Sequence, residues 1–522
     1  MRFRLYSISV MIASATLASQ AQSDSKVAYQ DRQYLGNISY GSDNPVSIYY
    51  MPISDIADIK VEYGHTGGNL HAIDDAGKIN AWSASFTGMK KVGKVIFSGG
   101  LVYNNQSLGD RRWNNTLFVS GHNPFIIGDS IISKFNNETF ALDGIAAYSP
   151  TDNLKIGIKA TYDVGSSATQ KDPRPEIKGM RFSLTPGAEY RIGRHTVGLS
   201  ANVGWLSEEV THTVVRTTTR QYVFLFQGLG AFETKDAVGY RRKYDGMRYG
   251  AHLQYSINKA EMSAISDFID IGYYSEYENA TDGSSVTKYK GGRYSGNGIS
   301  LGNRLQFRHG LNAVHNVTVS AATHNSTGTW YTQKQSTDAD GNLIYEVINE
   351  SDNLEGHDTR AGVAYRFDRT NASHLPTVSV NVSADIERTE IKNRIYGAKE
   401  DYTNAYISAN ATKRFAIRKS WLGATVRGGY RMSIDSSIKI DDMPSTYSII
   451  MNKYTRPAFD AMTAGYWEGG LELSYSLPLS IMHYGSVLDI KLSADYRSQT
   501  DKTTTLKDAD RFYLGVSAGF IF

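Results

Sequence analysis

Hydrophobic and polar residues alternate with a period of two along most of the chain from Asp55 to Phe522. In residues 377–387 the apolar face consists of Val378, Val380, Val382, Ala384 and Ile386. The opposite face carries serine, asparagine and acidic residues, and residues 153–164 and 487–497 repeat the pattern. A period of two is that of a β-strand with one face in apolar surroundings. Its recurrence, with little sign of amphipathic helices, predicts an all-β fold.

Short and long links alternate between the expected strands. The short links are expected near residues 88–92, 149–153, 191–194, 257–265, 309–313, 368–376, 415–421 and 477–485. The longer, polar links are expected near residues 66–77, 105–137, 165–178, 207–246, 280–296, 332–356, 392–400, 435–463 and 498–511. Short periplasmic turns and long extracellular loops are typical of transmembrane antiparallel β-barrels. The links therefore predict such a barrel over residues 55–522. It has about 18 strands if a weakly patterned opening strand near Ile56–His65 is counted, and about 16 otherwise.

The N-terminus has the pattern of a secretory signal peptide over residues 1–21. Arg2 and Arg4 precede a short, mostly apolar core, and Ser19-Gln20-Ala21 fits the small-x-small rule for cleavage. We therefore expect the mature chain to begin near Gln22. Residues 22–54 then precede the first strand, as a periplasmic segment or as a small plug that enters the barrel.

Composition agrees with a barrel and excludes several other classes of protein. A mean hydropathy of −0.37 argues against membrane-spanning helices, but a barrel strand faces lipid only at every second residue. The 35 tyrosines and 48 glycines, against 11 prolines, fit long strands with aromatic girdles. The absence of cysteine excludes disulfides, thiolate metal sites and lipoprotein anchoring. A net charge of +3 is too small to suggest a nucleic-acid partner.

The last strand carries the most specific resemblance. Phe512, Leu514, Val516, Ala518, Phe520 and Phe522 share one face of the C-terminal eleven residues. A terminal Phe on such a strand resembles the signature that outer-membrane barrels present to their assembly machinery. The resemblance implies the outer membrane of a Gram-negative bacterium as location, with both termini periplasmic. Expected partners are then outer-membrane lipid and lipopolysaccharide, and the assembly machinery through Phe520 and Phe522.

Two further resemblances concern the family. The Asn-Pro stretch within Asp43–Pro52 is similar to the opening segment of fatty-acid-transporter-like barrels. The chain as a whole resembles uncharacterised large outer-membrane barrels of the Bacteroidota, on its barrel pattern, its terminal Phe and the motif Lys171–Pro175. It differs from TonB-dependent receptors, because it lacks a long N-terminal plug domain and is too short for their 22 strands.

If the apolar faces contact lipid, the opposite faces line the lumen. Six arginines are expected on adjacent strands there, where they would form one basic wall: Arg304, Arg308, Arg360, Arg366, Arg427 and Arg431. Charged lumens select and orient solutes, so this wall is a candidate contact for anionic or polar solutes. The alternative is that the arginines pair with luminal carboxylates and fill the barrel.

Two links are candidates for contacts with a ligand or a partner. The stretch Tyr222–Phe232 is too apolar for a solvated loop, and its aromatic members are Tyr222, Phe224, Phe226 and Phe232. It would constrict the lumen, rest on the outer leaflet, dock a partner, or belong to a strand pair above the membrane. Trp113 lies in a second cluster of cationic and aromatic residues that reaches His122 and Phe125.

No catalytic, metal or cofactor site is predicted. The 12 histidines are scattered, and none forms a His-x-x-x-His or Gly-x-Ser-x-Gly arrangement. The leading hypothesis is a channel or transporter for small polar or anionic solutes. The alternative is a non-conducting binding or scaffold barrel that holds a surface lipoprotein or ligand through its extracellular loops. A lipid hydrolase is the least favoured function.

Overall fold

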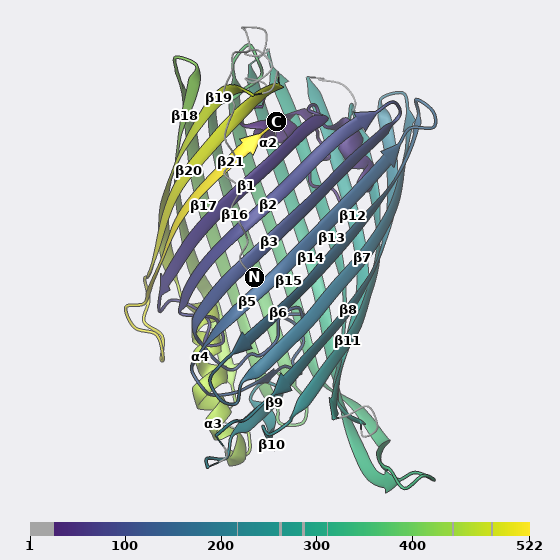
Figure 1. Ribbon diagram of the computed structural model, residues 1–522, viewed down its shortest axis with the longest axis vertical. Coiled ribbons are helices and arrows are strands. Elements are labelled where there is room, and N and C mark those ends of the chain that lie inside the picture. Colours follow the sequence, from purple (N-terminus) through teal and green to yellow (C-terminus); the bar gives the residue numbers. More distant parts are fainter. Residues whose placement is uncertain are drawn as a thin grey trace, which may run out of the picture.

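A computed structural model describes residues 26–216, 218–259, 264–283, 288–310, 312–440, 443–481 and 484–522. Eighteen strands form one closed antiparallel barrel, which confirms the predicted fold and strand number (Figure 1). They are β1 (Asp55–Gly68), β2 (Lys78–Val92), β3 (Val95–Arg111), β5 (Ser133–Tyr148), β6 (Leu154–Thr169), β7 (Pro175–Ile192), β8 (His195–His212), β11 (Arg241–Ile257), β12 (Ile265–Gly283), β13 (Lys288–His309), β14 (Ala313–Thr337), β15 (Leu343–Thr370), β16 (Pro376–Asn393), β17 (Ala398–Ile417), β18 (Ser420–Lys439), β19 (Tyr466–Ile481), β20 (Tyr484–Gln499) and β21 (Asp510–Ile521). The predicted signal peptide lies outside the described residues.

The first and last strands close the barrel. β1 pairs antiparallel with β21 in a register that places Asp58 opposite Ile521 and Gly68 opposite Arg511. Beyond the strand ends, Ala57 and Phe522 exchange two backbone hydrogen bonds of 3.0 and 2.7 Å. Closure leaves no strand edge unpaired, which an apolar medium requires because it offers no hydrogen-bond partners.

The outward face is apolar, as the alternation predicts. Ile299 and Leu301 of β13 and Leu471 and Leu473 of β19 are exposed on it. Aromatic side chains also pack together on this face, and Trp82, Tyr103 and Phe140 form one such row across three strands. These exposed apolar residues form the surface that a bilayer would cover.

The strand ends differ from the prediction where polar strands continue beyond the apolar belt. β14 and β15 remain paired out to Thr337 and Leu343, so most of the loop expected at 332–356 is a hairpin that projects from the barrel (Figure 1). The two strands satisfy each other's backbone groups, so this extension needs no apolar face. The turn expected near 88–92 is also wrong by a few residues, because β2 continues to Val92.

The remaining elements are short. The helices α2 (Tyr29–Gly36) and η1 (Pro45–Tyr50) precede the barrel, and η2 (Ser445–Tyr447), α3 (Ser448–Ile450), η3 (Met451–Thr455) and α4 (Arg456–Thr463) connect β18 to β19. β4 (Ile127–Gly128), β9 (Tyr222–Gly228) and β10 (Ala231–Asp236) form a separate three-stranded sheet. In the described part of the chain, none of the helices is long and apolar enough to cross a membrane. Figure 1 shows α2 and the C-terminus at one end of the barrel and α3, α4, β9 and β10 at the other.

Candidate functional site

Residues 26–54, called the N-terminal segment below, contact inward-facing residues around the barrel. The Lys26 ammonium donates to the Gly485 carbonyl at 2.7 Å, and the Tyr29 hydroxyl donates to Asp58 of β1 at 2.9 Å. The other end of the segment reaches the opposite strands, where η1 packs on β3, β5, β6 and β7. The segment therefore lies across the end of the lumen where the C-terminus is (Figure 1).

Two of the predicted luminal arginines hold the C-terminal end of α2. The Arg304 guanidinium donates to the carbonyls of Tyr34 at 2.7 Å and Asn37 at 3.2 Å, and it stacks on the Tyr34 ring 3.6 Å from the centroid. Arg308 donates to the Leu35 carbonyl. The last carbonyls of a helix lack partners within the helix and carry partial negative charge, so cations there stabilise it. The arginines thus position α2.

Asp31 of α2 forms the ionic contact with the wall. Its carboxylate accepts from Arg366 of β15 at 2.8 Å and from Arg414 of β17 at 2.5 Å. Burial raises the pKa of Asp31, but the charges of Arg414 and Arg366 outweigh burial, so the pKa is lowered from its ordinary value of 3.8. Asp31 therefore stays ionised and paired at neutral pH.

The lowered pKa predicts release of the segment in acid. A group with a depressed pKa stabilises the folded state fully above its unfolded-state value, and this contribution disappears as the pH falls through the lowered pKa. We expect residues 26–54 to stay docked down to about pH 4 and to become protease-sensitive below it. Asp31→Asn should make cleavage high at every pH, whereas Glu387→Gln should keep the pH step. A pH-independent wild-type cleavage pattern would contradict this linkage.

The Asn-Pro pair of the segment fills a niche in the opposite wall. The Asn44 amide donates to Gln254 of β11 at 2.8 Å and to the Ala188 carbonyl at 3.3 Å, while its oxygen accepts from the Val46 N–H at 3.0 Å. A Cβ atom on Gly187 of β7 would lie 2.4 Å from the Asn44 side-chain oxygen and 2.7 Å from Pro45. Gly187 thus leaves the space that the Asn-Pro pair occupies.

A side chain at Gly187 is expected to displace the segment. Gly187→Val should expose residues 26–54 to added protease, because the new side chain would overlap both Asn44 and Pro45. Gly302→Val is the matched control: Gly302 also lies in an inward position of a strand, but a Cβ there has no atom within 4 Å. Equal cleavage in the two variants would show that the niche does not hold the segment.

Residues 112–132, called the luminal loop below, fold into the barrel from the other end. Glu208 of β8 accepts from the N–H groups of Leu117 at 2.9 Å and Phe118 at 2.5 Å. Glu278 of β12 accepts from the N–H of Ser120 at 3.0 Å and from the Asn123 amide at 2.7 Å. The loop links β3 to β5 yet bonds to β8 and β12, so it crosses the lumen.

The apolar stretch 222–232 packs on this loop. β9 pairs with β4 of the luminal loop, and Phe224 and Phe226 are buried around Trp113 with ring-centroid distances of 5.3 and 6.5 Å. Phe232 packs on Phe224, whereas Tyr222 is exposed. Of the predicted contact residues, four form or border an internal core and only Tyr222 faces outward.

The six predicted arginines do not form one basic wall. β16 and β17 separate β18, with Arg427 and Arg431, from β15. Arg360 pairs with Glu387 at 2.9 Å, and Arg427 pairs with Asp495. Arg431 donates to the Met462 carbonyl at the end of α4. The prediction of adjacency was wrong, since the links expected at 368–376, 392–400 and 415–421 already place two strands between Arg366 and Arg427.

A cavity of about 610 Å³, called the luminal chamber below, lies between the N-terminal segment and the wall. Its lining combines both charges and aromatic rings: Tyr34, Asp43, Asp270, Arg304, Arg360 and Glu387. A second cavity of about 540 Å³ shares Arg360 and Glu387 with it and is lined by the luminal loop, β9 and α4. The two cavities therefore continue one another along the lumen, and their linings suit a polar solute.

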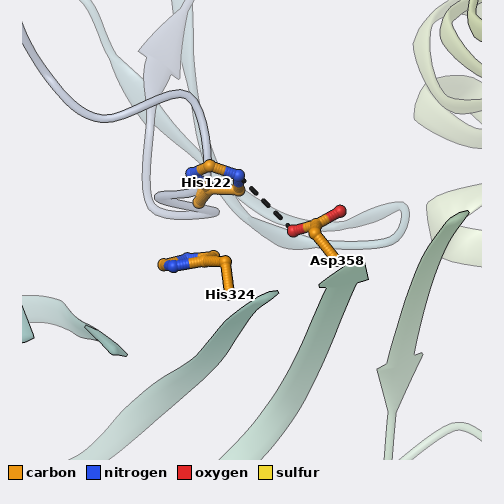
Figure 2. Close-up of side chains that lie close together, drawn as sticks. All are labelled: His122, His324 and Asp358. Carbon is orange, nitrogen blue, oxygen red and sulfur yellow. Dashed lines mark ion pairs between the residues drawn. The ribbon is translucent and has the colours of Figure 1, made fainter. Parts of the chain in front are cut away.

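The sequence patterns did not predict one cluster of chemically active residues. His122 of the luminal loop, His324 of β14 and Asp358 of β15 offer ligand atoms that all lie within 4.8 Å of one another (Figure 2). They come from three segments far apart in the chain, so no spacing motif could reveal them. The one indication in the sequence was strand alternation, which places His324 and Asp358 on positions that face the lumen.

Three solved structures are distantly similar to this chain, each with a TM-score below 0.5. The ferric yersiniabactin uptake receptor FyuA from Yersinia pestis is 9% identical, with 90% of this chain and 81% of that chain covered and a TM-score of 0.44. A Pseudomonas aeruginosa FadL homologue is 9% identical, with 97% and 98% covered and a TM-score of 0.34. The outer membrane transporter YddB from Escherichia coli is 10% identical, with 88% and 80% covered and a TM-score of 0.39.

These values are too low to transfer what those proteins bind. No curated protein matches the chain. A family model does match, over residues 45–522, and its description is a family of unknown function, DUF6850. The match begins at Pro45 and covers every barrel strand, and the chain therefore belongs to the DUF6850 family.

Proposed function

We propose that this chain is a gated outer-membrane barrel through which small polar or anionic solutes pass. The observation that supports this function best is the luminal chamber, a charged cavity bounded by a separate N-terminal segment. Since that segment is held by side-chain contacts and is not a barrel strand, it can leave without breaking the barrel. In this proposal residues 26–54 are the plug and the chamber is the solute site.

The proposed orientation places the short turns and both termini in the periplasm, so that the luminal loop enters from outside. The difference in length between the two sets of links supports it. Phe520 and Phe522 stack at 6.3 Å at the C-terminal end of the chain, where the assembly machinery would contact them, while outer-membrane lipid and lipopolysaccharide would surround the barrel. In this proposal the barrel is distinct from TonB-dependent receptors, and its 18 strands, against the 22 strands of those transporters, support the distinction.

Planar-bilayer conductance of the full barrel and of a variant without residues 26–50 tests the proposal. A plugged channel conducts weakly until the segment is removed. Solute uptake into liposomes then distinguishes charge classes, and the chamber, which is lined by two arginines and four carboxylates, predicts faster uptake of neutral polar solutes than of anionic ones. A folded barrel that conducts nothing with or without the segment would exclude the function.

The projecting β14–β15 hairpin favours one second candidate, a scaffold for a surface lipoprotein. It extends beyond the barrel and exposes Leu343, Val347 and Ile348. Purification from native membranes would discriminate the candidates. A stoichiometric partner that is lost when residues 333–347 are removed supports the scaffold, and a barrel without any partner argues against it.

A further inference from the structure

The cluster of His122, His324 and Asp358 joins the luminal loop to the barrel wall. The His122 Nε2 atom lies 3.4 Å from an Asp358 carboxylate oxygen, and the His122 and His324 rings lie 4.1 Å apart between centroids. Figure 2 shows the His122 ring beside that of His324, with Asp358 directed at His122. The ligand atoms of two imidazoles and one carboxylate thus lie close together inside the barrel.

We propose that His122, His324 and Asp358 bind a divalent transition-metal ion that fastens the luminal loop to β14 and β15. Two imidazoles and a carboxylate are a set that Zn²⁺ and related ions prefer, whereas Mg²⁺ and Ca²⁺ prefer oxygen ligands. A tetrahedral ion with bonds of about 2.0–2.2 Å holds its ligand atoms roughly 3.4 Å apart. The cluster reaches this spacing by closing roughly 1 Å, and His122 can supply the movement because it lies on a loop.

Neighbouring hydroxyl groups already orient two of the ligands. The Tyr294 hydroxyl donates to Glu276 at 2.7 Å, so its oxygen accepts from the Nε2–H of His324 at 3.0 Å. The Thr389 hydroxyl donates to one Asp358 oxygen at 2.6 Å and leaves the other oxygen for His122 or an ion. Metal-binding histidines and carboxylates typically have such outer partners, which fix their tautomer and direction.

One hydrogen bond must be exchanged when the ion binds. The remaining nitrogen of His324, Nδ1, accepts from the Tyr274 hydroxyl at 2.6 Å. An ion at Nδ1 takes the place of that hydroxyl hydrogen, and Tyr274 then turns toward the cavity beside it, which it lines together with His122. The same cavity gives the ion a path to solvent and room for a water ligand.

The site is tested by metal titration of the folded barrel, purified without a histidine tag and treated with chelator. One Zn²⁺ per barrel is expected by calorimetry, and Co²⁺ should give the visible absorption of a tetrahedral site. Loss of an outer partner weakens metal sites by about 10–100-fold, so His122→Ala, His324→Gln or Asp358→Asn should weaken Zn²⁺ binding at least about 100-fold, and Tyr294→Phe about 10-fold.

His357→Ala is the matched control, because His357 neighbours Asp358 but is exposed and bonds to Asn325 and Thr359. It should bind Zn²⁺ like the wild type. His122→Ala keeps the assay informative, since a loop residue whose side chain is 40% exposed can change without unfolding the barrel. Zn²⁺ should also slow proteolysis within residues 112–132 in the wild type. The site would be overturned if the wild type did not bind Zn²⁺ stoichiometrically. It would also be overturned if a variant with all three ligand substitutions bound Zn²⁺ as well as the wild type.

Discussion

A barrel without residues 26–50 is expected to conduct ions at least about tenfold better than the mature chain, because open barrels of 16–18 strands enclose an aqueous channel. The N-terminal segment spans the lumen from Gly485 and Asp58 to η1 on β5–β7. Barrel closure does not depend on it, since β1 begins at Asp55 and pairs with β2 and β21. Single-channel recording in planar bilayers measures the difference.

The matched control for this truncation removes residues 333–347 from the β14–β15 hairpin. That deletion takes a shorter piece of chain from outside the lumen, and it should leave conductance unchanged. Equal conductance of the truncated and complete barrels, with both shown to be folded by their gel mobility before heating, would contradict the plug.

Asp282→Ala is expected to lower the free energy of unfolding by about 3–5 kcal/mol, the usual result of leaving one buried charge without its partner. Asp282 holds Arg242 through two hydrogen bonds of 2.7 Å, and the two side chains are only 5% and 1% exposed. Arg242 also donates to the Phe125 carbonyl at 3.2 Å, which Tyr244 shares at 2.9 Å. Urea unfolding measures the loss, and protease cleavage within residues 112–132 should increase with it.

Glu387→Ala serves as the control for Asp282→Ala. It breaks the Arg360–Glu387 pair, in which the arginine side chain is 62% exposed, so it should change the unfolding free energy by less than about 1 kcal/mol. A similar small change in both variants would show that the Arg242–Asp282 pair does not fasten the luminal loop.

The barrel itself could be predicted because strand alternation is a local property. Each strand shows an apolar residue to one side and a polar residue to the other, so its inward positions follow from nearby sequence alone. Arg304, Arg360 and Arg427 were placed in the lumen on this basis, and the structure has all three on inward positions. The polar ends of β14 and β15 were mistaken for a loop because alternation fades where neither face meets an apolar medium.

Contacts inside the lumen could not be predicted in the same way. From the sequence, residues 22–54 could be either a periplasmic segment or a plug, and the stretch 222–232 could lie in any of several places. Their positions depend on partners far away in the chain, such as Arg366 for Asp31, or Trp113 for Phe224. The histidine and aspartate cluster is of the same kind, since β14 and β15 bring His324 and Asp358 to His122.

By itself, the sequence determined the barrel and the side of each strand that faces the lumen, and it limited the strand number to 18 or 16, because these features depend on a period of two and on link length. Only the tertiary structure decided that the lumen is occupied from both ends, which charges are paired there, and where a chamber remains. Those features arise from contacts across the barrel between residues up to several hundred positions apart, as with Asp31 and Arg414. A local sequence pattern cannot show which of two such distant residues will be in contact.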